Sequence, residues 1–94
     1  MAHHFKFQHQ TNLTKENSFG TLARKNNATV NVEVFVGDDG DGWYEFYDES
    51  DPEEFHAEGE LVVEGNELID FDGCYSLPDF IINKLVEVGI KDGL

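Results

Sequence analysis

The chain has 94 residues, with six Lys or Arg against twenty Asp or Glu, and therefore a formal net charge of −14. Its length fits one domain, and no apolar run approaches the ~20 residues that a membrane-spanning helix needs, so no membrane association is expected. The charge argues against direct binding to nucleic acid, because phosphates repel it. A single cysteine excludes an internal disulfide framework. The N-terminal residues lack the apolar core of a secretory signal, so we expect a cytoplasmic location.

The first 27 residues predict a loosely ordered basic segment. They carry four basic residues and one acid. Phe5 and Phe7 alternate with Lys6 and Gln8, which is typical of a short strand. Residues 10–27 are rich in Asn, Thr and Lys and are expected to be a loop with at most one helical turn.

Residues 28–94 are expected to form a single α+β domain that begins with a β-hairpin. Four valines recur at every second position and share one face of its first strand, namely Val30, Val32, Val34 and Val36. The Gly- and Asp-rich residues 37–42 predict a loop, and 43–47 the second strand. The acidic stretch 48–54 is expected to be a connection, because it contains Pro52, which is disfavoured in a paired strand.

Residues 59–72 predict a second hairpin. Two apolar runs flank Gly65-Asn66, and both residue types tolerate the positive φ angles of a tight turn. The predicted sheet is therefore an antiparallel β-meander of four to five strands.

A C-terminal helix of about twelve residues is expected to pack on one face of this sheet, because its apolar residues recur at helical spacing. Ser76 is expected to cap the helix, with Pro78 in the first turn and Asp79 completing a capping box. Gly89 is the expected stop.

No catalytic constellation is apparent, and we expect no enzyme activity, no catalytic residues, no bound metal and no cofactor. Cys74 is interpreted as a partly buried packing residue rather than a nucleophile. His3, His4 and His9 lie far along the chain from this cysteine, so a zinc site of the usual Cys and His spacing is not predicted.

The loop at 37–42 offers carboxylates for a cation at Asp38, Asp39 and Asp41. It departs from an EF-hand because Gly37 stands at the first ligand position and strands flank the loop. Turn geometry explains these residues better, and weak divalent-cation binding is kept as an alternative function.

The acidic residues are the main functional feature. Between Glu33 and Asp79 there are seventeen acids and no Lys or Arg. This predicts either a solvated surface or a negative face for a basic partner, since a plain soluble domain mixes both signs. Acids at every second position of an extended chain lie ~6.6 Å apart, close to the spacing of alternate phosphates along a DNA strand.

We expect the partner-binding surface to lie in the acidic connection and the strand after it, with aromatic anchors from the strand before it. The expected partner-binding residues are Asp48, Glu49, Asp51, Glu53, Glu54, Glu58, Glu60, Trp43, Tyr44 and Tyr47.

In composition the chain resembles the small acidic inhibitor proteins of bacteriophages and mobile elements, which block restriction enzymes, CRISPR effectors and other nucleic-acid-binding machines. The resemblance implies a stoichiometric inhibitor whose carboxylate face mimics nucleic acid and blocks a basic protein partner. The alternative is a small homo-oligomeric structural protein, assembled through edge strands and the Val-rich strand.

Overall fold

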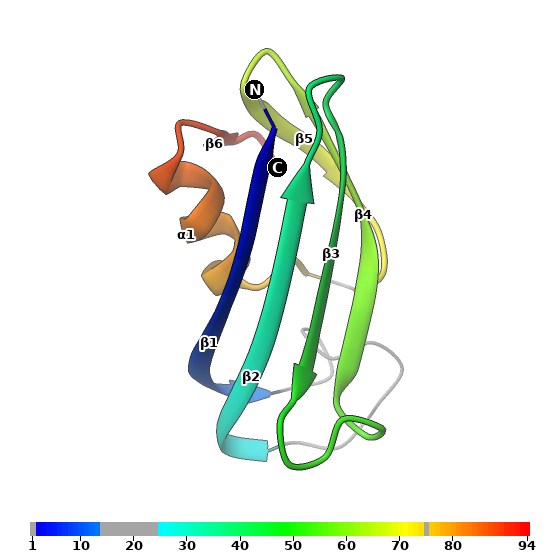
Figure 1. Cartoon of the computed structure of the whole chain (residues 1–94), viewed down its shortest axis with the longest axis vertical. Coiled ribbons are helices and arrows are strands. Elements are labelled where there is room, and N and C mark those ends of the chain that lie inside the picture. Colours follow the sequence, from blue (N-terminus) through cyan, green and yellow to red (C-terminus); the bar gives the residue numbers. More distant parts are fainter. Residues whose placement is uncertain (1, 14–24, 75) are drawn as a thin grey trace.

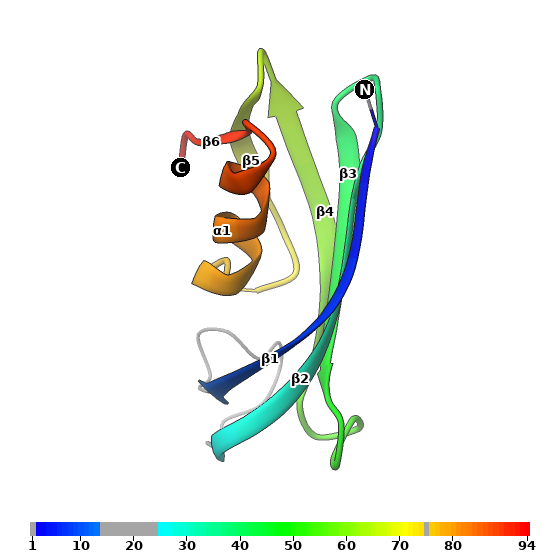
Figure 2. The ribbon, with the colours of Figure 1, turned by 60° about the vertical axis from the view of Figure 1, so that its left-hand side comes forward.

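The computed structural model describes residues 2–13, 25–74 and 76–94. Its elements are β1 (His3–Leu13), β2 (Lys25–Val36), β3 (Asp41–Asp48), β4 (His56–Glu64), β5 (Glu67–Phe71), α1 (Asp79–Glu87) and β6 (Lys91–Asp92). The strands form one sheet in the order β1-β2-β3-β4-β5-β6. The sheet curls like half a barrel, and α1 lies on its concave side (Figure 1 and Figure 2).

The predicted α+β class is confirmed, whereas the predicted meander of four to five antiparallel strands is wrong in its strand count and in its uniform direction. Strands β1 to β5 pair antiparallel, but β6 adds a sixth strand that runs parallel to β5. The pairs are Glu67↔Lys91 and Leu68↔Asp92. A strand of two residues is too short to show an alternation of apolar and polar residues, so its presence could not be predicted from the sequence pattern.

The N-terminal strand is longer than predicted. Residues 10–13, expected to be loop, continue β1, and residues 25–27, also expected to be loop, begin β2. The two strands pair in continuous register from His3↔Val36 to Thr11↔Ala28. Backbone hydrogen bonds to the neighbouring strand hold these residues in an extended conformation, although their polar composition predicted a loop. The remaining part of the expected loop, 14–24, lies outside the described residues.

Both predicted hairpins are present. β2 pairs with β3 across the turn at 37–40, and β4 pairs with β5 across Gly65-Asn66. Gly65 and Asn66 have φ angles of 58° and 62°, which match the two left-handed positions of a type I′ turn.

The helix begins later than its predicted cap. Pro78 is the N-cap, with extended backbone and no side-chain cap hydrogen bond, so the expected capping role of Ser76 is wrong. The predicted stop is confirmed, because Gly89 has φ 90° and its N–H donates to the Val86 carbonyl. The Ile90 N–H donates to Leu85, which completes a Schellman motif and directs the chain into β6.

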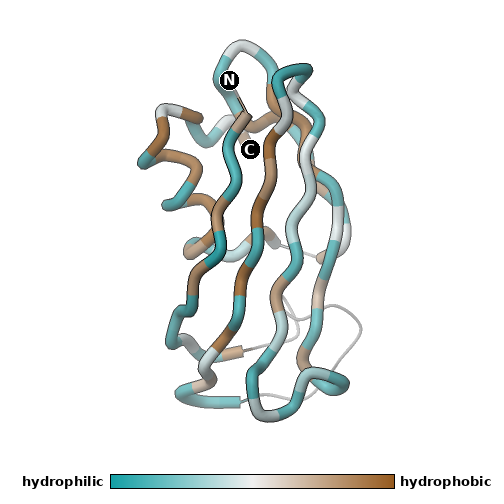
Figure 3. The backbone as a smooth tube through the Cα atoms, viewed as in Figure 1, coloured by the Kyte–Doolittle hydropathy of each residue, from teal (hydrophilic) through white to brown (hydrophobic). Residues whose placement is uncertain are grey.

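The core lies between α1 and the concave face of the sheet. The alternate valines of β2 are buried there as predicted, together with Tyr44 and Phe46 of β3 and Ile81 and Leu85 of α1. Hydrophobic residues are concentrated along β2 and α1 (Figure 3). The opposite, convex face of the sheet, here called the outer face, carries the other residue of each alternating pair.

Candidate functional site

The outer face is an ordered grid of side chains on β1 to β4, because cross-strand partners project from the same side of a sheet. Its members alternate with the core residues in each strand. The grid consists of His4, Lys6, Gln8, Thr29, Asn31, Glu33, Phe35, Trp43, Glu45, Tyr47, His56, Glu58 and Glu60.

One row of this grid is a line of carboxylates. Glu33 is the Cα partner of Glu45, and Glu45 is the Cα partner of Glu58. Neighbouring strands are about 4.8 Å apart, so three negative charges stand side by side. We call Glu33, Glu45 and Glu58 the acidic row. Lys6 continues the row on β1 as the partner of Glu33.

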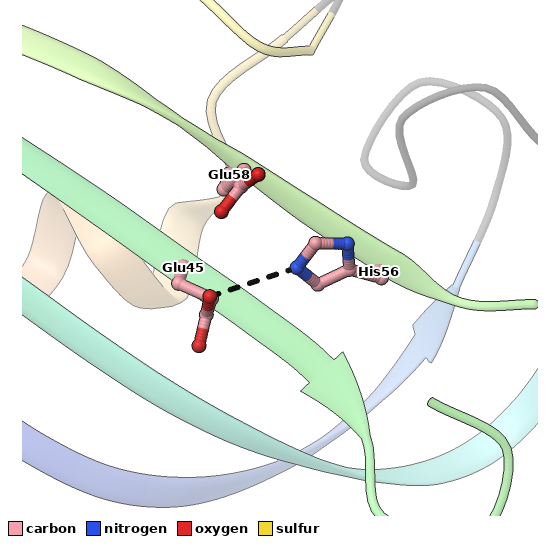
Figure 4. A group of neighbouring side chains, drawn as sticks. All are labelled: Glu45, His56 and Glu58. Atoms are coloured by element: carbon pink, nitrogen blue, oxygen red, sulfur yellow. Dashed lines mark ion pairs between the residues drawn. The ribbon is translucent and has the colours of Figure 1, made fainter. Parts of the chain in front are cut away.

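Two histidines flank the acidic row. His4 Nε2 lies 2.6 Å from Glu33 Oε2, and His56 Nε2 lies 3.7 Å from Glu45 Oε2. Figure 4 shows the His56 ring and the Glu45 and Glu58 carboxylates turned toward one another above β3 and β4. One ligand atom from each of these three residues lies within 4.8 Å of the other two. The chemistry of this face therefore combines carboxylate acceptors with imidazole nitrogens.

An aromatic group lies one row away from the acidic row. The Trp43 ring is stacked 6.0 Å from Phe35, and the His4 ring contacts both edge-on at 6.2 Å and 6.1 Å. Trp43 is 40% exposed, which is high for such a large apolar side chain. Exposed aromatic rings beside charged groups are typical of residues that anchor a protein partner.

A shallow hollow of about 410 Å³ opens on the same face. Its polar lining consists of Lys6, Gln8, Asn31, Glu33, Glu45 and Tyr47. Two members of the acidic row therefore border a depression large enough for one or two side chains of another molecule.

The structure brings some of the predicted partner-binding residues onto the outer face. Trp43, Tyr47, Glu58 and Glu60 belong to the grid. Glu49 follows β3 and accepts a hydrogen bond from Gln8 Nε2 at 3.2 Å.

The other predicted acids do not form the extended row that their spacing suggested. Asp51, Glu53 and Glu54 lie in a turn between β3 and β4. This turn is closed by the Phe55 N–H, which donates to the Asp51 carbonyl, and by burial of the Phe55 side chain. A tight turn breaks the period-2 geometry on which a 6.6 Å spacing depends.

Tyr44 is buried at 1% exposure, so the expectation that its side chain anchors a partner at the surface is wrong. It faces the core, and its hydroxyl donates to the Asp72 carbonyl at 2.5 Å and lies 3.1 Å from Cys74 Sγ. Burial and the contact with Cys74 raise the pKa of Tyr44 far above its ordinary value. Cys74 is partly buried against the core, as predicted. Burial also raises the pKa of its thiol, although the Tyr44 hydrogen bond opposes the shift.

Asp48 is also buried, at 1% exposure, so the expectation that it contacts a partner is wrong for the same reason. Its carboxylate accepts hydrogen bonds from Lys25 Nζ and from Ser50 Oγ. Burial alone would raise the pKa of Asp48, but these hydrogen bonds and the Lys25 charge outweigh it and lower the pKa. Asp48 thus fixes the end of the β2–β3 hairpin instead of facing solvent.

The Gly- and Asp-rich loop shows turn geometry. Asp39 Oδ1 accepts a hydrogen bond from the Asp41 N–H at 3.0 Å, and the Gly37 N–H donates to the Asp41 carbonyl. Within the part of the chain that the structure describes, Asp38, Asp39 and Asp41 do not bring their carboxylates together at metal-binding distances.

Sequence reasoning missed Glu33, Glu45, Lys6 and His4 as members of the site. The strand pattern placed Glu33 opposite the valines, which was a usable signal for an outer-face position. The cross-strand register that aligns Glu33 with Glu45 and Glu58 depends on pairing, and an alternating pattern within one strand does not reveal it.

No protein-family model matches this chain, and no curated protein or solved structure is significantly similar to it. No helix in the described residues has the length and apolar character required to cross a membrane.

Proposed function

We propose that this is a small non-enzymatic binding protein whose outer face engages a basic protein partner. The observation that carries the proposal is the acidic row, Glu33, Glu45 and Glu58, in which like charges stand directly opposite each other on neighbouring strands. Such an arrangement costs folding stability. The Arg and Lys side chains of a partner would remove this cost on binding and gain charge complementarity.

The hollow beside the acidic row supports the same proposal. A basic side chain entering it would place its charge next to Glu33 and Glu45 and its aliphatic stem along Tyr47. The exposed Trp43 adds an aromatic surface that can stack on a guanidinium group.

In its more specific form, the proposal is that the partner is a nucleic-acid-binding protein and that the outer face imitates its ligand, as inhibitors of phage or mobile-element type do. Acids in the row are about 4.8 Å apart across strands, and Glu60 is about 6.6 Å from Glu58 along β4. The separation of Glu58 and Glu60 is close to that of alternate phosphates along a DNA strand, so a cleft lined with Arg and Lys would meet two charges at a similar distance.

The test compares three tagged proteins as baits in a bacterial lysate that contains EDTA. The first is the parent, the second is E33Q/E45Q/E58Q, and the third is D51N/E53Q/E54Q, which has the same net charge but an intact acidic row. We expect the parent and the third protein to retain the same nucleic-acid-binding protein, and high salt or duplex DNA to release it. Equal retention by both triple variants would overturn the placement on the outer face.

A second candidate function, self-assembly, is favoured by the position of β1. This strand has 11 residues, and among the described strands it pairs only with β2. An edge strand of this length offers backbone groups to a strand of another copy. The Val-rich β2 does not offer such an edge, because β1 and β3 pair with both of its sides. If β1 pairs with a strand of another copy, the mass measured by light scattering should rise with protein concentration. A constant monomer mass would contradict self-assembly.

A further inference from the structure

The cluster of Glu45, His56 and Glu58 has a property that a partner-binding surface does not require. A nitrogen and two carboxylate oxygens, one from each residue, lie within 4.8 Å of one another. His56 Nε2 lies 3.7 Å from Glu45 Oε2. Ligands at bond lengths of about 2.1 Å in a tetrahedral shell are about 3.4 Å apart, so only small rotations of these side chains are needed to enclose an ion.

The backbone holds the three residues in place before any ion binds. Glu45 and Glu58 are Cα partners, and His56 is the partner of Tyr47, two residues from Glu45 on the same face. All three positions lie within paired segments of β3 and β4 rather than in loops. A site supported by hydrogen-bonded strands loses little conformational entropy when it binds an ion.

The charges in the cluster are not balanced by protein groups. The Glu58 carboxylate has no hydrogen-bond or ion-pair partner among the residues that the structure describes, and it faces Glu45 directly. The cluster contains two carboxylates, and Glu33 in the next strand adds a third. A divalent cation would neutralise the pair that the sheet forces together.

We propose that Glu45, His56 and Glu58 bind one divalent transition-metal ion, with Zn²⁺ as the best fit. One imidazole and two carboxylates give three protein ligands, and the half-exposed position of the cluster leaves a fourth position open to water. The imidazole nitrogen disfavours Ca²⁺ and Mg²⁺, which take oxygen ligands. The proposal goes beyond the partner-binding function and departs from the sequence-based expectation that no metal binds.

The test is calorimetric titration of the full chain with ZnCl₂ alone, in a buffer that does not chelate zinc. We expect one saturable Zn²⁺ site per chain, and H56Q or E58Q should weaken it at least about tenfold. E60Q is the matched control, because it removes the same charge from the same strand and face outside the cluster. H3Q controls for zinc bound by the N-terminal histidines. Circular dichroism of each variant verifies that it is folded.

A second readout is the nitrogen chemical shift of the His56 ring, which we expect to move on addition of Zn²⁺ in the parent and in E60Q. Three results would overturn the site: no saturable binding by the parent, unchanged binding in H56Q, or equal loss in E60Q and E58Q. Equal affinity for CaCl₂ would overturn the choice of ion. The partner experiment contains EDTA, so its outcome is independent of this one.

Discussion

Glu45 of β3 and Glu58 of β4 are direct cross-strand partners, and both project from the outer face of the sheet (Figure 4). Two like charges at a directly opposed pair of sites oppose folding unless another group compensates them. Among the described residues, Glu45 forms a contact with His56 at 3.7 Å, while the Glu58 carboxylate has no hydrogen-bond or ion-pair partner. The Glu45–Glu58 pair therefore lowers the stability of the fold where no other group compensates it.

The first prediction concerns this repulsion. E58Q should stabilise the metal-free protein by about 0.5 kcal/mol, because it removes one of two opposed charges and breaks no hydrogen bond. The free energy of unfolding in urea at low salt measures this change. The cross-strand partner of Glu60 is Trp43, so E60Q should stabilise the protein less. The gain in stability of E58Q over the parent should shrink at high salt, because salt screens the repulsion. A loss of stability in E58Q would contradict the prediction.

The second prediction concerns Asp48. D48N should destabilise the protein by about 2 kcal/mol at neutral pH, because Lys25 and Ser50 lose a buried charged acceptor. The folded-state pKa of Asp48 lies below its ordinary value of 3.8, so its contribution is present above about pH 4. It is lost as the pH falls through the folded-state pKa.

Urea unfolding at several pH values tests this sign. The stability gap between the parent and D48N should be constant from pH 7 to about pH 5 and should close at lower pH. A gap that widens on acidification would show that Asp48 does not carry its charge in the folded state.

The third prediction concerns two glycines with positive φ. Gly73 has φ 92°, and a Cβ there would lie 2.1 Å from the Glu58 carbonyl oxygen. G73A should therefore cost at least about 3 kcal/mol, since it combines backbone strain with a clash. Gly65 has φ 58° and no atom within 4 Å of its Cβ position, so G65A should cost only about 1 kcal/mol. Thermal unfolding of the two variants measures their losses of stability. A larger loss in G65A than in G73A would contradict the close approach of Gly73 to the Glu58 carbonyl.

Part of this fold could be predicted from the sequence, whereas the burial of two predicted site residues could not. The hairpins, the alternating core of β2 and the glycine stop of α1 follow from local rules of periodicity and turn chemistry, and all are confirmed. Asp48 and Tyr44 lie on the buried face of β3, and their burial depends on which face of that strand meets α1. Composition does not specify that choice, because Trp43 and Tyr47 would make an equally apolar face.

The fourth prediction concerns Cys74. Burial raises the pKa of its thiol, so little thiolate is present near neutral pH. Iodoacetamide should modify Cys74 in the folded protein much more slowly than in urea, and the rate should rise with pH beyond the range of an ordinary thiol. Mass spectrometry of timed samples follows the reaction. Equal rates in the folded and unfolded protein would contradict the buried position beside Tyr44.

The most direct test of the proposed partner-binding surface uses Trp43, which is the single tryptophan of the chain and lies one row from the acidic row. Its fluorescence is followed during titration with an Arg-rich peptide, in EDTA, for the parent, E33Q/E45Q/E58Q and D51N/E53Q/E54Q. The two variants carry the same net charge, so general attraction to the peptide is equal. We expect the acidic-row variant to bind at least about tenfold more weakly than the loop variant, with a smaller dependence on salt. Equal affinities for the two variants would contradict a binding surface at Glu33, Glu45 and Glu58.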